Sequence, residues 1–279
     1  MHDMRRKPLR FTKSLLLYGA LILLAIFMMG PFLWILSVSL MPGKNVFSSP
    51  PAIFPTFIDF DNYVQVWNYM DFPRYLMNTV IIALMGVVMN IFFSCLTAYP
   101  LAVFRFKGRD LIFALLVMTM IIPAAAGMVV NYLTVKALGL MGGFLAVVLP
   151  SAVTVFNIFL MRQAFMGMPH ELRDSGKVDG ASEFRIWLQL SLPIVKPAIA
   201  VIGLLEFQGM WNSFLWPMIV LNDTKQYPIA SALSFLNGQF AYNFGWIAAG
   251  TVISVIPIII VFLCTQKYYM EGVSGAVKG

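Results

Sequence analysis

The sequence turns abruptly polar at residues 168–193, which read MPHELRDSGKVDGASEFRIWLQLSLP and lie between two long apolar stretches. Across the whole chain 60% of residues are hydrophobic and only 11% are charged. This segment, which we call the polar island (Met168–Leu192), nevertheless carries four acidic and three basic side chains, with Lys196 just beyond it. Such a long charged loop in an apolar protein indicates a surface that docks onto something outside a membrane.

The apolar stretches around the island define the fold class. A helix needs about 20 apolar residues to cross a ~30 Å hydrocarbon core, and inside lipid its backbone groups can pair only within the helix. The sequence therefore predicts an all-α, polytopic membrane protein with six transmembrane helices, at Leu15–Leu40, Thr79–Val103, Leu111–Leu133, Gly143–Phe165, Ile194–Leu221 and Ile247–Gln266. Prolines within these spans, such as Pro123 and Pro150, are expected to kink or break them.

The first span has one alternative reading, a secretory signal peptide. Its apolar core is too long for that, and no small-residue cleavage motif follows it before Met41. We expect it to stay as a membrane anchor.

The basic residues are distributed unequally between the two sides of the predicted membrane. With six spans both termini share one side, and that side receives 15 of the 19 lysines and arginines, which leaves Lys44, Arg74, Lys136 and Lys225 on the other. Loops rich in lysine and arginine stay in the cytoplasm, so the termini and the polar island are expected there. The net charge of +7 is thus explained by topology, without nucleic-acid binding.

Four parts follow along the chain. We expect a cytoplasmic basic arm with the first transmembrane helix at 1–40, and an extracytoplasmic loop at 41–72 with a short surface helix at Asn62–Met70. A five-helix core is expected at 73–268, containing the island as its cytoplasmic loop, and a cytoplasmic tail at 269–279.

The island itself is predicted to form a helix-turn-helix. Pro169 suits the first turn of a helix, Gly180 can adopt the positive φ of a turn, and Ser182 is a good N-cap for a second helix, Glu183–Leu190. In that second helix Phe184, Trp187 and Leu188 have the spacing of an apolar face. A hairpin with such a ridge could insert into a groove on a partner protein; the alternative is a helix lying on lipid headgroups.

The stretch from Glu171 to Pro193 resembles the coupling loop, or EAA loop, of the permease subunits of bacterial ABC importers. The likeness rests on Gly180 and on its spacing to Leu192-Pro193. The sequence departs from the family where Asp174-Ser175-Gly176 replaces Glu-Ala-Ala. Since glycine lowers helix propensity, we expect Gly176 to make the first coupling helix less rigid.

Three further segments carry the same resemblance. Phe104–Arg109 is similar to a cytoplasmic turn of the carbohydrate branch of this family, and Trp211–Pro217 to that branch's fifth-span motif. The end, Tyr269–Gly279, is similar to the tail of the maltose-type second permease subunit. Together these motifs imply a type I permease fold in the bacterial cytoplasmic membrane.

The resemblance also implies partners and contact residues. It implies a second permease subunit, two ATPase subunits, an extracellular solute-binding protein and a sugar substrate. It further implies coupling to the ATPase through Glu171, Asp174, Ser175, Gly176, Asp179, Gly180, Ala181, Phe184, Arg185 and Trp187, and a tail contact at Gly275, Ala276, Val277 and Lys278. The chain has no G-x-x-x-x-G-K-[ST] phosphate loop. We therefore expect no cofactor or metal in this chain, and ATP with Mg²⁺ on a separate ATPase.

Glu206 is the only acidic residue within a predicted span. Ionisable groups at membrane depth usually face a cavity or a partner, and Gln208, Trp211 and Asn212 follow closely. Amide and aromatic groups suit the hydroxyls and apolar faces of sugars, so these four residues are candidates for the substrate pathway. The alternative for Glu206 is a hydrogen bond to the partner permease.

Two other function classes have less support. An intramembrane enzyme would need H-E-x-x-H, G-x-S-x-G or a carboxylate pair, and the sequence has none within a span. A secondary transporter would carry ion-coupling charges and repeats. Within the importer class, a sugar-derived polyol or a glycerol phosphate ester is the alternative solute.

Overall fold

The computed structural model describes residues 6–42, 54–55, 57–69, 71–239 and 244–277. The chain divides into two compact units, residues 1–71 with 236–253, and residues 72–235 with 254–279. The described residues contain helices joined by turns, and none of them lies in a strand. The predicted all-α class is confirmed for this part of the chain.

Three helices of the described residues are long and apolar enough to cross a membrane alone. They lie in α1 (Arg6–Ser39), α3 (Phe72–Val103) and α14 (Phe244–Val277). Three pairs of shorter helices pass the same test only when the two members of a bent pair are taken together. The described residues therefore offer three spans, or up to six if each bent pair is one span.

The bent pairs break at or near prolines. The first joins α4 (Arg109–Met118) and η1 (Thr119–Ile121) to α5 (Ala124–Ala137), with Pro123 at the break. The second joins α6 (Phe144–Val148) and η2 (Leu149–Ser151), which contains Pro150, to α7 (Val155–Met166) at an angle of 52°. The third joins α9 (Glu183–Ile186), η3 (Trp187–Ser191) and α10 (Leu192–Ile194) to α11 (Lys196–Trp211) at 80°. Proline lacks the N–H that would continue the helix ladder, which explains these positions.

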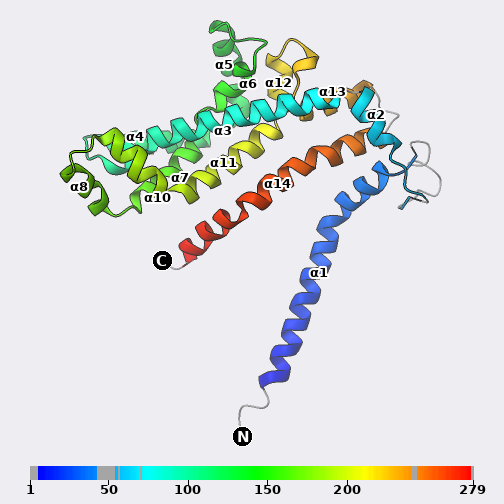
Figure 1. Ribbon diagram of the computed structural model, residues 1–279, viewed down its shortest axis with the longest axis horizontal. Coiled ribbons are helices and arrows are strands. Elements are labelled where there is room, and N and C mark those ends of the chain that lie inside the picture. Colours follow the sequence, from blue (N-terminus) through cyan, green and yellow to red (C-terminus); the bar gives the residue numbers. More distant parts are fainter. Residues whose placement is uncertain (1–5, 43–53, 56, 70, 240–243, 278–279) are drawn as a thin grey trace. The chain divides into compact units, whose positions relative to one another are not determined.

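Helix α3 is the centre of the unit formed by residues 72–235 and 254–279, and it packs along α11 and α7 (Figure 1). Small residues permit this close approach. A Cβ on Gly86 of α3 would lie 2.6 Å from Met210 Cγ of α11, and a Cβ on Gly203 of α11 would lie 3.3 Å from Ile91 Cδ1 of α3. Close backbone approach at small residues is the usual basis of helix packing in membranes.

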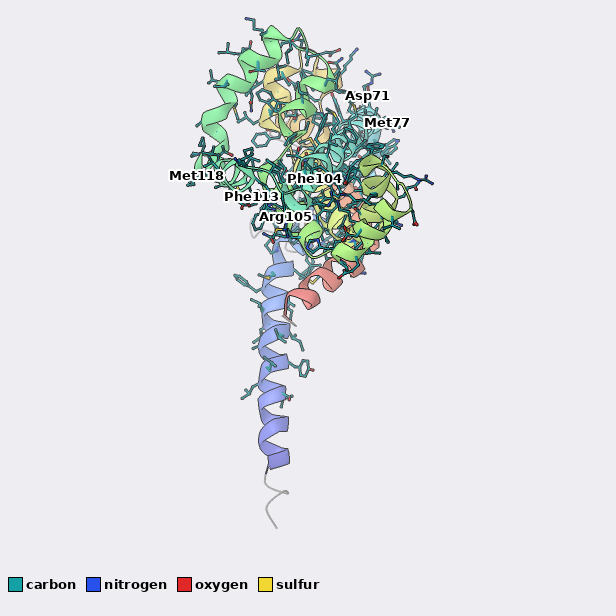
Figure 2. All side chains as sticks on the ribbon, turned by 90° about the vertical axis from the view of Figure 1, so that its left-hand side faces the viewer. Asp71, Met77, Phe104, Arg105, Phe113 and Met118 are labelled. Atoms are coloured by element: carbon teal, nitrogen blue, oxygen red, sulfur yellow. The ribbon has the colours of Figure 1, made fainter. Side chains whose placement is uncertain are left out.

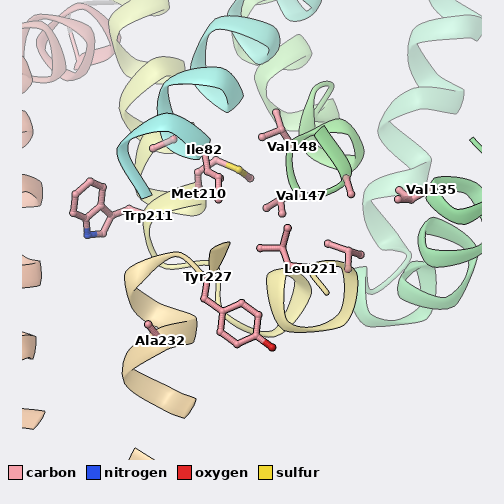
Figure 3. Packing of buried hydrophobic residues seen from close by; sticks show 12 residues of the cluster. Ile82, Val135, Val147, Val148, Met210, Trp211, Leu221, Tyr227 and Ala232 are labelled. Carbon is pink, nitrogen blue, oxygen red and sulfur yellow. The ribbon is translucent and has the colours of Figure 1, made fainter. Parts of the chain in front are cut away.

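Two buried apolar clusters fill this unit. The first surrounds Ile82, Met210 and Trp211 and extends to α6 and α12 (Leu215–Val220) (Figure 3). Tyr227 and Ala232 of the same cluster follow η4 (Thr224–Gln226), and Ala232 belongs to α13 (Ile229–Gln239). The second cluster lies toward the C-terminal end of α3 and holds Tyr99, Phe165 and Trp187. The polar island is attached to this second cluster.

A buried polar network ties α3 to the break between η2 and α7. The Asn90 side chain donates to the Ser151 carbonyl oxygen (2.8 Å) and to Thr154 Oγ1 (3.2 Å). Its Oδ1 accepts from Asn157 Nδ2 (2.7 Å) and from Ser94 Oγ (3.2 Å). A carboxamide can make four such bonds, so Asn90 is fully satisfied and holds backbone that the broken helix leaves unpaired.

The other unit, residues 1–71 with 236–253, contains α1, α2 (Asp61–Tyr69) and the beginning of α14. Side chains project from all round α1 (Figure 2), and the large ones between Leu15 and Leu36 are mostly apolar and exposed, as a lipid-facing helix requires. Asn62 Nδ2 donates to the carbonyl oxygens of Ser39 (3.0 Å) and Met41 (2.7 Å). Helix α2 confirms the surface helix predicted after residue 61.

Candidate functional site

The polar island forms two helices joined at a glycine. Helix α8 (His170–Val178) begins after Pro169, and α9 begins after Ser182, whose hydroxyl accepts from the Arg185 N–H at 3.3 Å. Gly180 has φ +75°. Its N–H donates to the Lys177 carbonyl oxygen, and the Ala181 N–H donates to that of Gly176, both at 3.0 Å. This pair of bonds is the Schellman ending of a helix, which needs a residue with positive φ. We call residues 168–194 the α8–α9 hairpin.

Gly176 is the point of closest packing inside this hairpin. It is buried, and a Cβ there would lie 3.0 Å from both Ile186 Cγ1 and Leu190 Cδ1. Helix α8 continues through Gly176 without a break. The glycine that departs from the Glu-Ala-Ala pattern therefore lets the two arms of the hairpin approach each other.

An ion-pair cluster fixes the two arms. Arg173 Nη2 donates to Glu183 Oε1 at 2.6 Å and Arg173 Nε to Glu183 Oε2 at 3.3 Å. Lys177 Nζ lies 3.2 Å from the same Oε1. The hydrogen bond to Glu183 raises the pKa of Arg173, partly offset by burial, which lowers it. The Arg173 guanidinium also lies 5.3 Å from the centroid of the Phe104 ring, just beyond α3. Hairpin and α3 are thus joined at this end.

The three residues of the expected apolar ridge do not share one exposed surface. Phe184 is 63% exposed and Leu188 48%, whereas Trp187 is only 5% exposed and belongs to the cluster around Phe165. The regular helix expected over Glu183–Leu190 gives way to a π-helical turn at Trp187–Ser191. The exposed apolar surface of α9 and η3 therefore centres on Phe184 and Leu188.

The other residues expected to contact an ATPase lie on the outer surface of the hairpin. Glu171, Asp174, Ser175, Asp179 and Arg185 are exposed. A shallow cavity of about 220 Å³ opens between the arms. It is lined by Gly176, Asp179, Ala181, Arg185, Ile186, Gln189 and Leu190. Sequence reasoning missed Gln189 and Leu190, although their place four residues after Arg185 and Ile186 on a helix was the available signal.

The four candidate pathway residues on and after α11 fall into two groups. Glu206 is buried on the side facing Gly86 of α3, and its Oε1 makes no hydrogen bond within the described part of the chain. Trp211 is also buried, and its Nε1 donates to the Ser254 carbonyl oxygen at 3.0 Å. Gln208 and Asn212 are exposed, and Asn212 Nδ2 donates to the Gln208 carbonyl oxygen at 2.9 Å.

Gln208 is the polar residue of a largely apolar cavity. This cavity measures about 660 Å³ and lies between α7, α11 and α14, with Phe156, Leu205 and Phe262 in its wall. The structure therefore brings Gln208, but not Glu206, to an open surface of the bundle.

The expected tail contact falls at the limit of what the structure describes. Gly275, Ala276 and Val277 belong to the last turns of α14, their side chains lie outside the described residues, and Lys278 lies outside them altogether. Of the described residues, no three histidine, cysteine, aspartate or glutamate side chains lie close enough to hold a metal ion.

Comparison with known proteins identifies the family. Residues 90–274 match the family described as the binding-protein-dependent transport system inner membrane component. The chain belongs to this permease family. It is a membrane component of a transport system and not an enzyme.

Several relatives of this permease are named for sugar transport. It is 34% identical over 227 residues, 81% of each chain, to the arabinooligosaccharides transport system permease protein AraQ of Bacillus subtilis (strain 168). It is 32% identical to the lactose transport system permease protein LacG of Rhizobium radiobacter, covering 94% of this chain and 95% of that one. Its fold matches a chain of a bacterial ABC transporter involved in the import of the acidic polysaccharide alginate, with TM-score 0.81, 27% identity and coverage of 96% and 99%.

Proposed function

We propose that this permease forms half of the translocation pathway of an ATP-driven, binding-protein-dependent importer for a sugar or an oligosaccharide. The observation that carries the proposal is the combination of an ordered, charged hairpin with an apolar helical bundle that belongs to a transport family. The substrates for which its relatives are named, arabinooligosaccharides, lactose and alginate, support the substrate class.

The proposed topology has six spans in the bacterial cytoplasmic membrane, with each bent pair counted as one span. Both termini and the α8–α9 hairpin are then cytoplasmic. The asymmetry of the basic residues, 15 on one side against four on the other, supports this orientation.

The α8–α9 hairpin is the proposed docking surface for a separate ATPase. The exposed side chains of Phe184 and Leu188 would fill a groove of the partner, and the charged residues around them would form the rim. The ion pairs of Glu183 with Arg173 and Lys177 support a rigid element that can transmit movement. The tail residues Gly275–Lys278 are proposed as a second contact.

The assembly proposed around this chain contains a second permease subunit, two ATPase subunits and an extracellular solute-binding protein. ATP and Mg²⁺ would bind to the ATPases. Gln208 and Asn212 would contribute to the pathway from an open face of α11, and Glu206 from its buried face. The same machinery importing a polyol or a glycerol phosphate ester is the second candidate.

Reconstitution tests the function. The chain, co-expressed with the neighbouring permease, ATPase and binding-protein genes and placed in liposomes, is expected to take up labelled oligosaccharide only when ATP is inside and binding protein is outside. Uptake by this chain alone, driven by an ion gradient, would instead establish a secondary transporter.

Docking is tested by Phe184→Ser, with Phe57→Ser as a matched control. Both phenylalanines are exposed, 63% and 58%, but Phe57 lies in the loop expected on the opposite side of the membrane. Phe184→Ser is expected to reduce the ATPase that co-purifies with the permease, and Phe57→Ser to leave it unchanged. Equal retention in both variants would exclude Phe184 from the docking surface.

A further inference from the structure

A basic cavity lies at the end of α3, beside the α8–α9 hairpin and separate from its outer surface. It measures about 220 Å³ and lies between the segment that follows α3, the end of α7 and the start of α8. Arg105, Arg109, Arg173 and His170 line it. The rest of the wall is apolar and includes Val103, Phe165 and Met168. The cavity thus combines three guanidinium groups with an apolar wall.

Two of the arginines are held in place. Arg109 Nε donates to Asp110 Oδ1 at 3.0 Å and its Nη2 to Asp110 Oδ2 at 3.3 Å. Arg173 is held by Glu183 and by the Phe104 ring. Because these guanidinium groups are already oriented, they lose little side-chain entropy when they bind a ligand.

The third arginine is free. Arg105 is exposed and makes no hydrogen bond, ion pair or ring contact within the described part of the chain; Figure 2 labels it. Its five potential donors are therefore available. An arginine fork matches the geometry of a phosphate better than an ammonium group does.

Positive charge exceeds negative charge around the cavity. Arg105, Arg109 and Arg173 line the cavity and no acidic side chain of the described residues does; Asp110 pairs with Arg109 and Glu183 with Arg173, which leaves Arg105 in excess. Glu171 and Asp174 of α8 are exposed and do not line the cavity. An anion would therefore meet a net positive site.

We propose that this cavity binds the phosphate group of an anionic phospholipid, with Arg105 as its principal ligand and Arg109 and Arg173 beside it. The position supports a lipid, because α3 is long and apolar enough to span a membrane and ends at Val103, two residues before Arg105. The apolar wall would contact the part of the acyl chains nearest the glycerol backbone of the lipid. Basic pockets between transmembrane helices on the cytoplasmic side of a membrane bind lipid headgroups.

Arg105→Gln tests the proposal, with Lys107→Gln as its control. Both residues are exposed and basic and lie two positions apart, but Lys107 does not line the cavity. Neither substitution removes a contact of the described residues, so both variants are expected to fold. The permease, purified with its partner subunits, is placed in phosphatidylcholine nanodiscs with increasing shares of phosphatidylglycerol, and bound phosphatidylglycerol is counted by native mass spectrometry.

The wild type and Lys107→Gln are expected to bind phosphatidylglycerol with equal affinity, and Arg105→Gln about fivefold more weakly. Equal affinity of the two variants would overturn the site. Addition of a large excess of inorganic phosphate distinguishes a lipid phosphate from free phosphate as the ligand of the cavity. If it leaves phosphatidylglycerol bound, the lipid is supported; if it displaces the lipid, free phosphate is the ligand and the lipid assignment is overturned.

Discussion

Asn157 Nδ2 of α7 donates a 2.7 Å hydrogen bond to Oδ1 of Asn90 on α3, and both side chains are buried. The bond joins two helices that are 67 residues apart in the sequence. Because Asn90 also binds the Ser151 carbonyl oxygen at the break before α7, this pair positions a bend of 52°. The broken helix and the straight one therefore stabilise each other.

Replacement of Asn90 by leucine is expected to destabilise the permease by about 1–3 kcal/mol, because it leaves buried polar groups without partners. The quantity to measure is the free energy of unfolding in mixed micelles. Ser94→Ala is the matched control, since it removes a single 3.2 Å bond of the same network and leaves Asn90 with its three others. Equal effects of the two substitutions would contradict the central position of Asn90.

The contact between Gly86 and Met210 gives a second prediction. A valine at position 86 would place its Cβ 2.6 Å from Met210 Cγ, and overpacking of this kind costs about 1–3 kcal/mol. Combining Gly86→Val with Met210→Ala should recover part of the loss, since the pair shares one space. In contrast, Gly209→Ala meets nothing within 4 Å and should be neutral or stabilising by up to about 1 kcal/mol. If the double variant loses as much free energy of unfolding as the two single variants together, the two residues do not compete for space.

Gly180 supports a prediction about transport. Valine at φ +75° is strained although space around Gly180 is open, at a cost of roughly 1–2 kcal/mol that falls on the hairpin alone. Gly180→Val should therefore reduce ATP-dependent uptake while the melting temperature of the membrane bundle stays unchanged. Asparagine tolerates this conformation better, so Gly180→Asn should retain more uptake than Gly180→Val. Full uptake by the valine variant would contradict the need for this turn.

Glu206→Gln tests the buried carboxyl group. The substitution keeps the shape of a side chain that lies in a packed interface with α3, so the amount of assembled complex should change little. Uptake kinetics in membrane vesicles are expected to change more than assembly does. Unchanged uptake kinetics would remove Glu206 from the pathway.

Local patterns in the sequence predicted much of this fold. Apolar stretches predicted three helices that are long and apolar enough to cross a membrane, and prolines marked the breaks near Pro123 and Pro150. Ser182 precedes a helix and Gly180 follows one, as expected. These features depend on residues close in sequence, which is why they can be read from it. The six-span count and the division into arm, loop, core and tail stay predictions.

Packing over long distances was not predictable in the same way. The closeness of Gly176 to Ile186 and Leu190 depends on how the two arms of the hairpin meet. Helix propensity describes only the residue itself, so it predicted Gly176 to be a poor helix former and could not predict this contact. Trp187 was expected on an exposed ridge because its spacing matched a regular helix. Instead, its indole is buried in the cluster around Phe165, a contact between residues that are distant in the sequence.

The burial of Trp187 has a mechanical consequence. Trp187 belongs to a buried cluster with residues of α3, α7 and α11, and it lies only a few residues before the 80° bend that leads into α11. The ring centroid of the exposed Phe184 is 5.4 Å from that of Trp187. We therefore expect Trp187 to connect the exposed Phe184 with the buried cluster at the C-terminal end of α3.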